Sequence, residues 1–331
     1  MDKIDDLLAQ ISERASNRST RDQKKAGLIL PANNAATLTA GTSPVFADVA
    51  ILVALRDPEL KQVIDASNIA WAPVGREGIV FNVGRAKFGD QEVTVATAAQ
   101  TTMGMVSAAV LATKTIRAWR PKLLAMTGIC AGVKGKVNLG DIIVAQQVFD
   151  YGSGKLQNDT LIPDYDPVAM DNELRNYAQH LANDSRALRS IKDAWQSSVG
   201  KPDHELKAFV GKFASGAAVV ADERRVKDIQ QHMRSLLGID MEAYGVARAA
   251  QLANFPTVPF LIVKGVQDFA DDFKDDRYRE YAAFVSAGYL FHLLERYWAE
   301  LGRRSRAESD TGCPLYRAGE CARIPPSRIK E

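Results

Sequence analysis

Two apolar segments in the second half of the chain end in carboxylates. Residues 238–244 read Gly-Ile-Asp-Met-Glu-Ala-Tyr and carry Asp240 and Glu242, whereas residues 263–268 read Val-Lys-Gly-Val-Gln-Asp and end in Asp268. Residues at positions i and i+2 of an extended segment face the same side. We therefore expect Asp240 and Glu242 to point into one cleft, at a strand end where α/β proteins bind ligands. Convergent carboxylates suit a reaction that builds positive charge on its substrate.

Two further segments contain residue types that hold polar ligands. Arg-Asp-Pro-Glu at 56–59 follows an apolar run, so Glu59 could hold a water or a sugar hydroxyl beyond a strand end. Taken alone, this segment fits a helix start better, because an Asp cap followed by Pro is common there. Thr101, Thr102 and Gly104 precede a predicted helix, and such a turn can bind an anion or a sugar.

Glycines recur in the segment 127–144, which begins Thr-Gly-Ile-Cys-Ala-Gly and ends Leu-Gly-Asp-Ile-Ile-Val. They either allow the backbone to approach a ligand closely or serve tight turns between strands. Their spacing is neither G-x-G-x-x-G nor that of a P-loop. The sequence therefore does not predict a dinucleotide-binding fold or a P-loop nucleotide-binding site.

The composition is that of a soluble globular protein, with 331 residues of which 46% are hydrophobic and 25% charged. A net charge of +2 gives no bulk electrostatic reason to bind nucleic acid or an anionic membrane. The chain has no apolar run of membrane-spanning length and no N-terminal signal, so we expect a cytoplasmic location. Its three cysteines form no disulfide framework. Cys130 is expected to be a buried thiol, and no metal site is expected at Cys313 and Cys321.

Apolar runs and helical periodicity predict the elements that must position these residues. The predicted strands are 49–55, 79–83, 91–98, 123–129, 141–149, 206–214, 240–242 and 259–266. The predicted helices are 103–119, 171–181, 187–197, 226–237, 243–253 and 277–301, and residues 151–167 are predicted to form a long loop. Strands that alternate with helices predict an α/β domain with a mixed, largely parallel sheet.

The predicted domain organisation has three parts. Residues 1–46 form a leader or arm with a short amphipathic helix, residues 47–301 form the main body, and residues 302–331 form a polar tail that is either disordered or docked elsewhere. The leader is either a flexible segment or an arm for oligomerisation or partner docking.

In their order along the chain, these segments resemble the nucleoside phosphorylase/nucleosidase superfamily over roughly residues 47–300. The most specific parts are the glycine-rich block 127–144 and the Asp-Met-Glu-Ala block 240–243, followed by the strand-terminal Asp268. The resemblance implies a three-layer fold with a central mixed β-sheet flanked by helices. It also implies a purine nucleoside or nucleotide as substrate, no cofactor, and a homo-oligomer, either a dimer or a hexamer.

The resemblance also implies catalytic roles. Glu242 would bind the ribose hydroxyls together with Met241, and Asp268 would protonate the leaving purine. Glu59, in the segment Leu-Arg-Asp-Pro-Glu at 55–59, resembles the carboxylate that orients the attacking water in hydrolytic members.

Further substrate contacts follow from the same resemblance. Thr101, Thr102 and Gly104 would lie beside the ribose or phosphate, and Val219 and Val220 would flank the base. Three positions depart from the family pattern at the predicted base pocket: Lys264 replaces an Arg, Gln267 replaces a Ser, and Ala217 replaces an Asp.

Breaking the bond between a base and ribose leaves an electron-rich base and a cation-like sugar, so the base needs a proton and the sugar needs nearby negative charge. The turn at 101–107 contains no Arg for inorganic phosphate, and Glu59 would repel it. Hydrolysis is therefore favoured over phosphorolysis, and a non-catalytic nucleotide-sensing module is the remaining alternative.

Basic residues near the predicted loops, among them Arg85 and Lys155, suggest phosphate contacts and hence a nucleotide such as AMP or ATP. Such an activity is similar to that of nucleosidase-like proteins in bacterial anti-phage defence.

Overall fold

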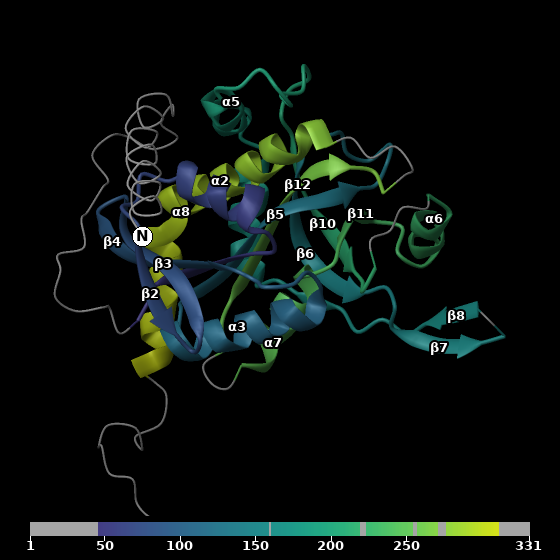
Figure 1. The fold of residues 1–331 in the computed structure, drawn as a ribbon, viewed down its shortest axis with the longest axis horizontal. Coiled ribbons are helices and arrows are strands. Elements are labelled where there is room, and N and C mark those ends of the chain that lie inside the picture. Colours follow the sequence, from purple (N-terminus) through teal and green to yellow (C-terminus); the bar gives the residue numbers. More distant parts are fainter. Residues whose placement is uncertain (1–45, 159, 219–222, 254–256, 271–275, 311–331) are drawn as a thin grey trace, which may run out of the picture.

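The computed structural model describes residues 46–158, 160–218, 223–253, 257–270 and 276–310 (Figure 1). The strands are β1 Val49–Val53, β2 Ala72–Arg76, β3 Ile79–Phe88, β4 Gln91–Ala99, β5 Leu123–Gly132, β6 Ile142–Asp150, β7 Gly154–Gln157, β8 Thr160–Pro163, β9 Val168–Ala169, β10 Ala208–Ser215, β11 Leu236–Asp240 and β12 Phe260–Asp268. The helices are α2 Lys61–Asp65, α3 Met105–Trp119, α4 Asn172–Ala182, α5 Ser185–Ala194, α6 Glu223–His232, α7 Ala243–Leu252 and α8 Arg279–Asp310, with short turns η1 Arg56–Leu60 and η2 Asp276–Tyr278.

One sheet contains every described strand except β7 and β8, in the order β11-β10-β6-β12-β5-β1-β4-β3-β2, with β9 beside β6. The four adjacent strands β4, β1, β5 and β12 are parallel to one another, whereas β6 runs antiparallel to β12. Because β11 also pairs with β5, the strands β11, β10, β6, β12 and β5 close into a ring. The predicted α/β fold with a central mixed sheet flanked by helices is confirmed.

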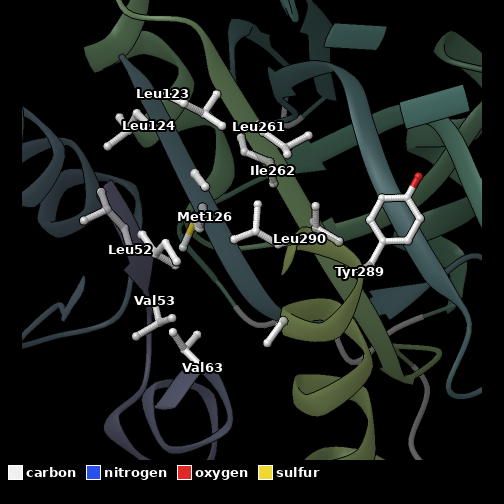
Figure 2. Packing of buried hydrophobic residues seen from close by; sticks show 14 of the residues in the cluster. Leu52, Val53, Val63, Leu123, Leu124, Met126, Leu261, Ile262, Tyr289 and Leu290 are labelled. Atoms are coloured by element: carbon white, nitrogen blue, oxygen red, sulfur yellow. The ribbon is translucent and has the colours of Figure 1, made fainter. Parts of the chain in front are cut away.

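The core lies where the parallel strands are covered by α8. All residues of β1 are buried, as expected for a parallel strand covered on both faces. Figure 2 shows side chains of β1, β5 and β12, among them Leu52, Met126 and Ile262, gathered with Leu290 of α8. Burial of one such aliphatic side chain stabilises the fold by about 1.5–3 kcal/mol. Away from α8, helices α3 and α7 pack against each other (Figure 1).

The segment 240–242 is not the strand that the sequence predicts. Strand β11 ends at Asp240, and Glu242 is the residue that precedes the first turn of α7, with φ −129° and ψ −39°. The Oδ1 of Asp240 accepts the backbone N–H groups of Glu242 and Ala243, both at 3.1 Å. The side chain therefore turns the chain into α7, and the expected arrangement on one face of one strand is wrong.

Two other local predictions are wrong. The predicted helix 226–237 ends at His232, because Leu236 already begins β11 beside β10. The predicted loop 151–167 contains the β7–β8 hairpin, which turns at Asn158 with φ +49°. The hairpin projects from the body (Figure 1).

The predicted leader 1–46 and tail 302–331 lie mostly outside the described residues. Residues 1–45 and 311–331 are not described, whereas α8 passes the predicted boundary at 301 and continues to Asp310. No described helix has the length and apolar character needed to cross a membrane.

Candidate active site

A cavity of ≈ 340 Å³ opens where β1, β5, β11 and β12 end, which is the size of a small-molecule site. Its described lining is strongly acidic: it contains the carboxylates of Glu59, Asp240, Glu242, Asp268 and Asp276. Among the described residues of the lining, Arg279 is the only basic side chain. The cavity is thus suited to a substrate that becomes positively charged in the reaction.

Glu59 enters the cavity from η1, directly after β1, and is only 2% exposed. Its Oε2 accepts the N–H of Leu55 at 2.7 Å, and its Oε1 accepts the N–H of Ile129 at 2.9 Å. Gly128 makes room for this carboxylate, because a Cβ there would lie 2.1 Å from Oε1 and its φ is +149°. The missing side chain at Gly128 therefore leaves the space that the Glu59 carboxylate occupies.

Burial raises the pKa of Glu59 above its ordinary value, although Lys264 and the backbone N–H groups partly oppose this shift. The carboxylate is therefore a stronger base than an exposed glutamate.

Glu242 lies at the start of α7 and is 5% exposed. Its Oε1 accepts the N–H of Gly104 at 2.8 Å and the side-chain amide of Gln100 at 3.3 Å. Gly104 has φ +111°, a conformation that favours glycine. Burial and the neighbouring Asp240 raise the pKa of Glu242. The turn between β4 and α3 thus serves the site by holding this carboxylate with a backbone amide.

Behind the cavity wall, Lys264 of β12 forms an ion pair with Asp240, with 3.1 Å between Nζ and Oδ2. The lysine is fully buried. Burial alone would lower its pKa, but the nearby carboxylates of Asp240, Glu59 and Glu242 raise it, and the net shift is upward. Lys264 therefore stays charged and offsets the negative charge of the wall.

Asp268 is the last residue of β12, and its side chain contacts that of the preceding residue, Gln267. The register of β12 against β5 shifts between Val266 and Asp268, and a bulge of this kind re-aims side chains next to active sites. Both Gln267 and Asp268 line the cavity. The Nε2 of Gln267 donates to Oδ2 of Asp268 at 3.0 Å, and the N–H of Ala270 donates to Oδ1 at 2.9 Å. The carboxylate is thus held from two sides.

The structure brings most of the predicted site residues to one place. Glu59, Asp240, Met241, Glu242 and Asp268 all line the cavity. Others are near it without lining it: Gly104 contributes its backbone N–H, Lys264 lies behind the wall, and the side chains of Thr101 and Thr102 are exposed beside it. Val219 and Val220 lie outside the described residues.

Arg85 and Lys155 do not reach the cavity. Arg85 pairs with Thr94 across the β3–β4 ladder. Thr94 lies six residues before Gln100, which marks the cavity end of β4, and six residues of a strand span about 20 Å. Its guanidinium binds the Glu92 carboxylate at 2.8 Å instead. Lys155 lies on β7, all of whose residues are exposed.

Three polar residues of the site were not predicted: Gln100, Asp276 and Arg279. Gln267 was noted only as a departure from the family pattern beside a predicted acid, and the structure places it in the lining. Gln100 and Arg279 carry no local signal, because only the fold brings the end of β4 and the start of α8 to Glu242 and Asp268. In the described part of the chain, no group of His, Cys, Asp and Glu is arranged to hold a metal ion.

Comparisons with known proteins place this geometry in a family. The family model of the phosphorylase superfamily matches residues 48–288. The uncharacterized protein y4jS of Sinorhizobium fredii is 35% identical over 257 residues, which cover 75% of this chain and 61% of that protein. The ATP nucleosidase Cap17 of Escherichia coli is 30% identical over 217 residues, which cover 61% of this chain and 42% of that protein. The chain thus spans about two fifths to three fifths of the length of these curated relatives.

The fold has solved counterparts as well. The 5′-methylthioadenosine/S-adenosylhomocysteine nucleosidase of Helicobacter pylori superposes with a TM-score of 0.59 at 19% identity, covering 76% of this chain and 100% of that one. At this identity the likeness concerns the fold, whereas the family match extends over residues 48–288. The chain belongs to the phosphorylase superfamily.

Proposed function

We propose that the chain hydrolyses the bond between a purine base and ribose in a nucleoside or nucleotide. One observation carries this proposal: Glu59, Glu242 and Asp268 come from three separate segments and line one cavity. Relatives named as nucleosidases, among them the ATP nucleosidase Cap17, support the reaction class.

The reaction needs two proton transfers, and the cavity has a carboxyl group for each. As the C1′–N bond breaks, its electron pair leaves with the base, and Asp268 gives a proton to a purine ring nitrogen. Glu242 binds the ribose hydroxyls and stabilises the positive charge that develops on the sugar. A water held by Glu59 bonds to C1′ and gives a proton to Glu59. Exchange with solvent then removes the proton from Glu59 and restores one to Asp268, so that one water is consumed. Each proton transfer of this kind contributes about 10²–10⁴-fold.

The place of Glu59 favours water over phosphate as nucleophile. Both of its oxygens are fixed by backbone N–H groups, and burial raises its pKa, so it is suited to take a proton from water. Inorganic phosphate would meet the repulsion of this carboxylate and of the other acids in the wall. A phosphorylase also needs several cationic contacts to phosphate, whereas the described lining has Arg279 alone.

Arg279 favours a nucleotide over a nucleoside as substrate. Its side chain lines the cavity and its buried Nε has no hydrogen-bond partner in the described structure, so we expect the guanidinium to bind a 5′-phosphate group there. The name of the relative Cap17 agrees with a nucleotide substrate. A role in anti-phage defence, which the sequence resemblance implies, stays a prediction.

The test is base release by the purified protein from AMP, ATP and adenosine, with and without inorganic phosphate. We expect free purine without added phosphate. Asp268→Asn should lower the rate by about 10²–10⁴-fold and spare nucleotide binding, and Arg279→Met should raise KM for AMP but not for adenosine. Base release that requires phosphate would identify a phosphorylase, and nucleotide binding without any base release would identify a sensing module.

Self-association is a further part of the proposal. Met103, Val106 and Val110 form an exposed apolar stripe that begins at the cavity and continues along α3. A second copy of the chain that covers this stripe would bury it. Sedimentation of the wild type and of Val106→Glu tests this, since the charged variant should dissociate.

A further inference from the structure

Gln267 holds a buried polar atom that the proposed mechanism does not use. Its Nε2 donates to Asp268, but its Oε1 is buried and has no hydrogen-bond partner among the described residues. A buried acceptor left without a donor destabilises a protein by about 1–3 kcal/mol. Such atoms in folded proteins therefore call for an explanation. Because Gln267 lines the cavity beside Asp268, the missing donor is best supplied by the bound substrate.

We propose that Gln267 reads the substituent at position 6 of the purine, so that the site selects a 6-aminopurine over a 6-oxopurine. This inference rests on the proposed function, since it assumes that Asp268 faces the leaving base.

The two ends of the Gln267 amide have different tasks. The Nε2 of Gln267 donates to Oδ2 of Asp268 at 3.0 Å, so this end of the amide faces the carboxyl group. The Oε1 end is then left for the cavity. The N–H of Ala270 holds the other oxygen of Asp268 at 2.9 Å. The contact that orients the proposed acid thus also decides which end of the amide meets the base.

The purine edge explains why these two neighbours act together. Adenine presents the acceptor N7 next to the donor N6–H₂, whereas guanine presents two acceptors, N7 and O6, on the same edge. A proton on Asp268 aimed at N7 would place the neighbouring Oε1 of Gln267 near position 6. With a 6-aminopurine the pair offers one donor and one acceptor to matching groups. With a 6-oxopurine, the Oε1 of Gln267 would face another oxygen with no proton between them.

The mismatch should have a large effect on specificity. A site that hydrogen-bonds a substrate N–H discriminates strongly against an analogue that lacks it, because its own buried group then stays unpaired. We expect the wild type to prefer AMP over IMP by about 10²-fold or more in kcat/KM. AMP and IMP carry the same ribose phosphate, so the ratio isolates the base.

Two substitutions test the roles of the two ends of the Gln267 amide separately. Gln267→Met keeps the length of the side chain and removes both the acceptor and the donor, so the preference for AMP should fall to less than about tenfold. Gln267→Glu keeps an oxygen at the Oε1 position, removes the donor to Asp268 and places a second carboxyl group beside it. This variant should react more slowly with both substrates and keep the preference for AMP. An equal AMP-to-IMP ratio in the wild type and in Gln267→Met, or loss of the preference in Gln267→Glu, would overturn the inference.

A binding measurement keeps this inference separate from the proposed function. Calorimetric titration of the three proteins with free adenine and free hypoxanthine requires no turnover. Tighter binding of adenine by the wild type and by Gln267→Glu, but not by Gln267→Met, supports the role of Gln267 even if no base is ever released. Equal affinity of all three proteins for the two bases refutes it, even if hydrolysis is confirmed.

Discussion

Two ion pairs of similar length lie in opposite environments. Lys264 and Asp240 are 3.1 Å apart, with side-chain exposures of 0% and 3%, whereas Arg85 and Glu92 are 2.8 Å apart, with exposures of 40% and 57%. An exposed pair is screened by solvent and contributes about 0–1 kcal/mol to stability. In a buried pair each charge has lost its hydration, so removal of one partner leaves the other uncompensated. Burial, and not the distance, decides what each pair does.

The same difference separates the chemistry of the two regions. At the cavity, Lys264 is shared by Asp240, Glu59 and Glu242, all of which raise its pKa. The surrounding burial raises the pKa of Glu59 and of Glu242. On the β3–β4 ladder, solvent surrounds Arg85 and Glu92, and the pair has no further charged partner among the contacts of the described structure. Only the first region can hold carboxylates in the states that proton transfer to and from a substrate needs.

Glu59→Gln gives the largest expected effect. An amide cannot take a proton from water, and its NH₂ group would oppose a backbone N–H of Leu55 or Ile129. We expect the rate of base release to fall by about 10²–10⁴-fold, measured by chromatography of the free base. Glu92→Gln, the matched change in the exposed pair, should alter this rate less than about twofold. A Glu59→Gln variant with more than about a tenth of the wild-type rate would contradict the role of Glu59 as the base.

Lys264→Met should have the next largest effect, this time on stability. It leaves the carboxylate of Asp240 buried without its cation, which lowers the free energy of unfolding by about 3–5 kcal/mol. Arg85→Met should lower it by about 0–1 kcal/mol. Urea denaturation at neutral pH measures both values. Equal losses in the two variants would show that burial does not separate the two ion pairs.

The sequence predicted the parts of the cavity that depend on local pattern. The strands of the parallel region are continuous apolar runs because both faces are buried, so β1, β4, β5 and β12 were found within a few residues. The acids at or just after the ends of these strands and β11 were therefore found as well. Asp240 and Glu242 do line one cavity, but the i, i+2 geometry predicted for them was wrong, because it assumes that the strand continues, whereas the side chain of Asp240 ends it.

The remaining features depend on tertiary contacts that no local pattern contains. The bulge that turns Gln267 toward the cavity arises from the register of β12 against β5. Arg279 reaches the lining only because α8 begins at the cavity. The basic residues favoured from the sequence, Arg85 and Lys155, lie outside the described lining of the cavity instead, and only the pairing of β3 with β4 and of β7 with β8 reveals this.

The pH dependence of activity sharpens the comparison further. Because burial raises the pKa of Glu59 above its ordinary value of 4.5, the acid limb of kcat/KM should lie above pH 4.5. Activity is lost as the pH falls through this raised pKa, since the base becomes protonated. The folded state binds this proton more readily than the unfolded state, so through Glu59 acidification favours the fold. Across the acid limb of the pH profile, measurements of base release should therefore show lost activity, while circular dichroism should show that the protein stays folded. A limb that coincides with unfolding would contradict this.

The smallest expected effect is that of Arg85→Ala on substrate affinity. Sequence analysis favoured this residue for phosphate binding, but the ladder places it about 20 Å along β4 from the cavity end. The screened charge should act only weakly over that distance, because the Debye length at physiological ionic strength is about 8 Å. We expect KM for AMP to stay within about twofold of the wild-type value, whereas Arg279→Met raises it. Steady-state kinetics of both variants at one ionic strength decide between the two residues. A rise in KM for Arg85→Ala alone would mean that the substrate phosphate reaches the β3–β4 ladder, and that the charged surface takes part in binding after all.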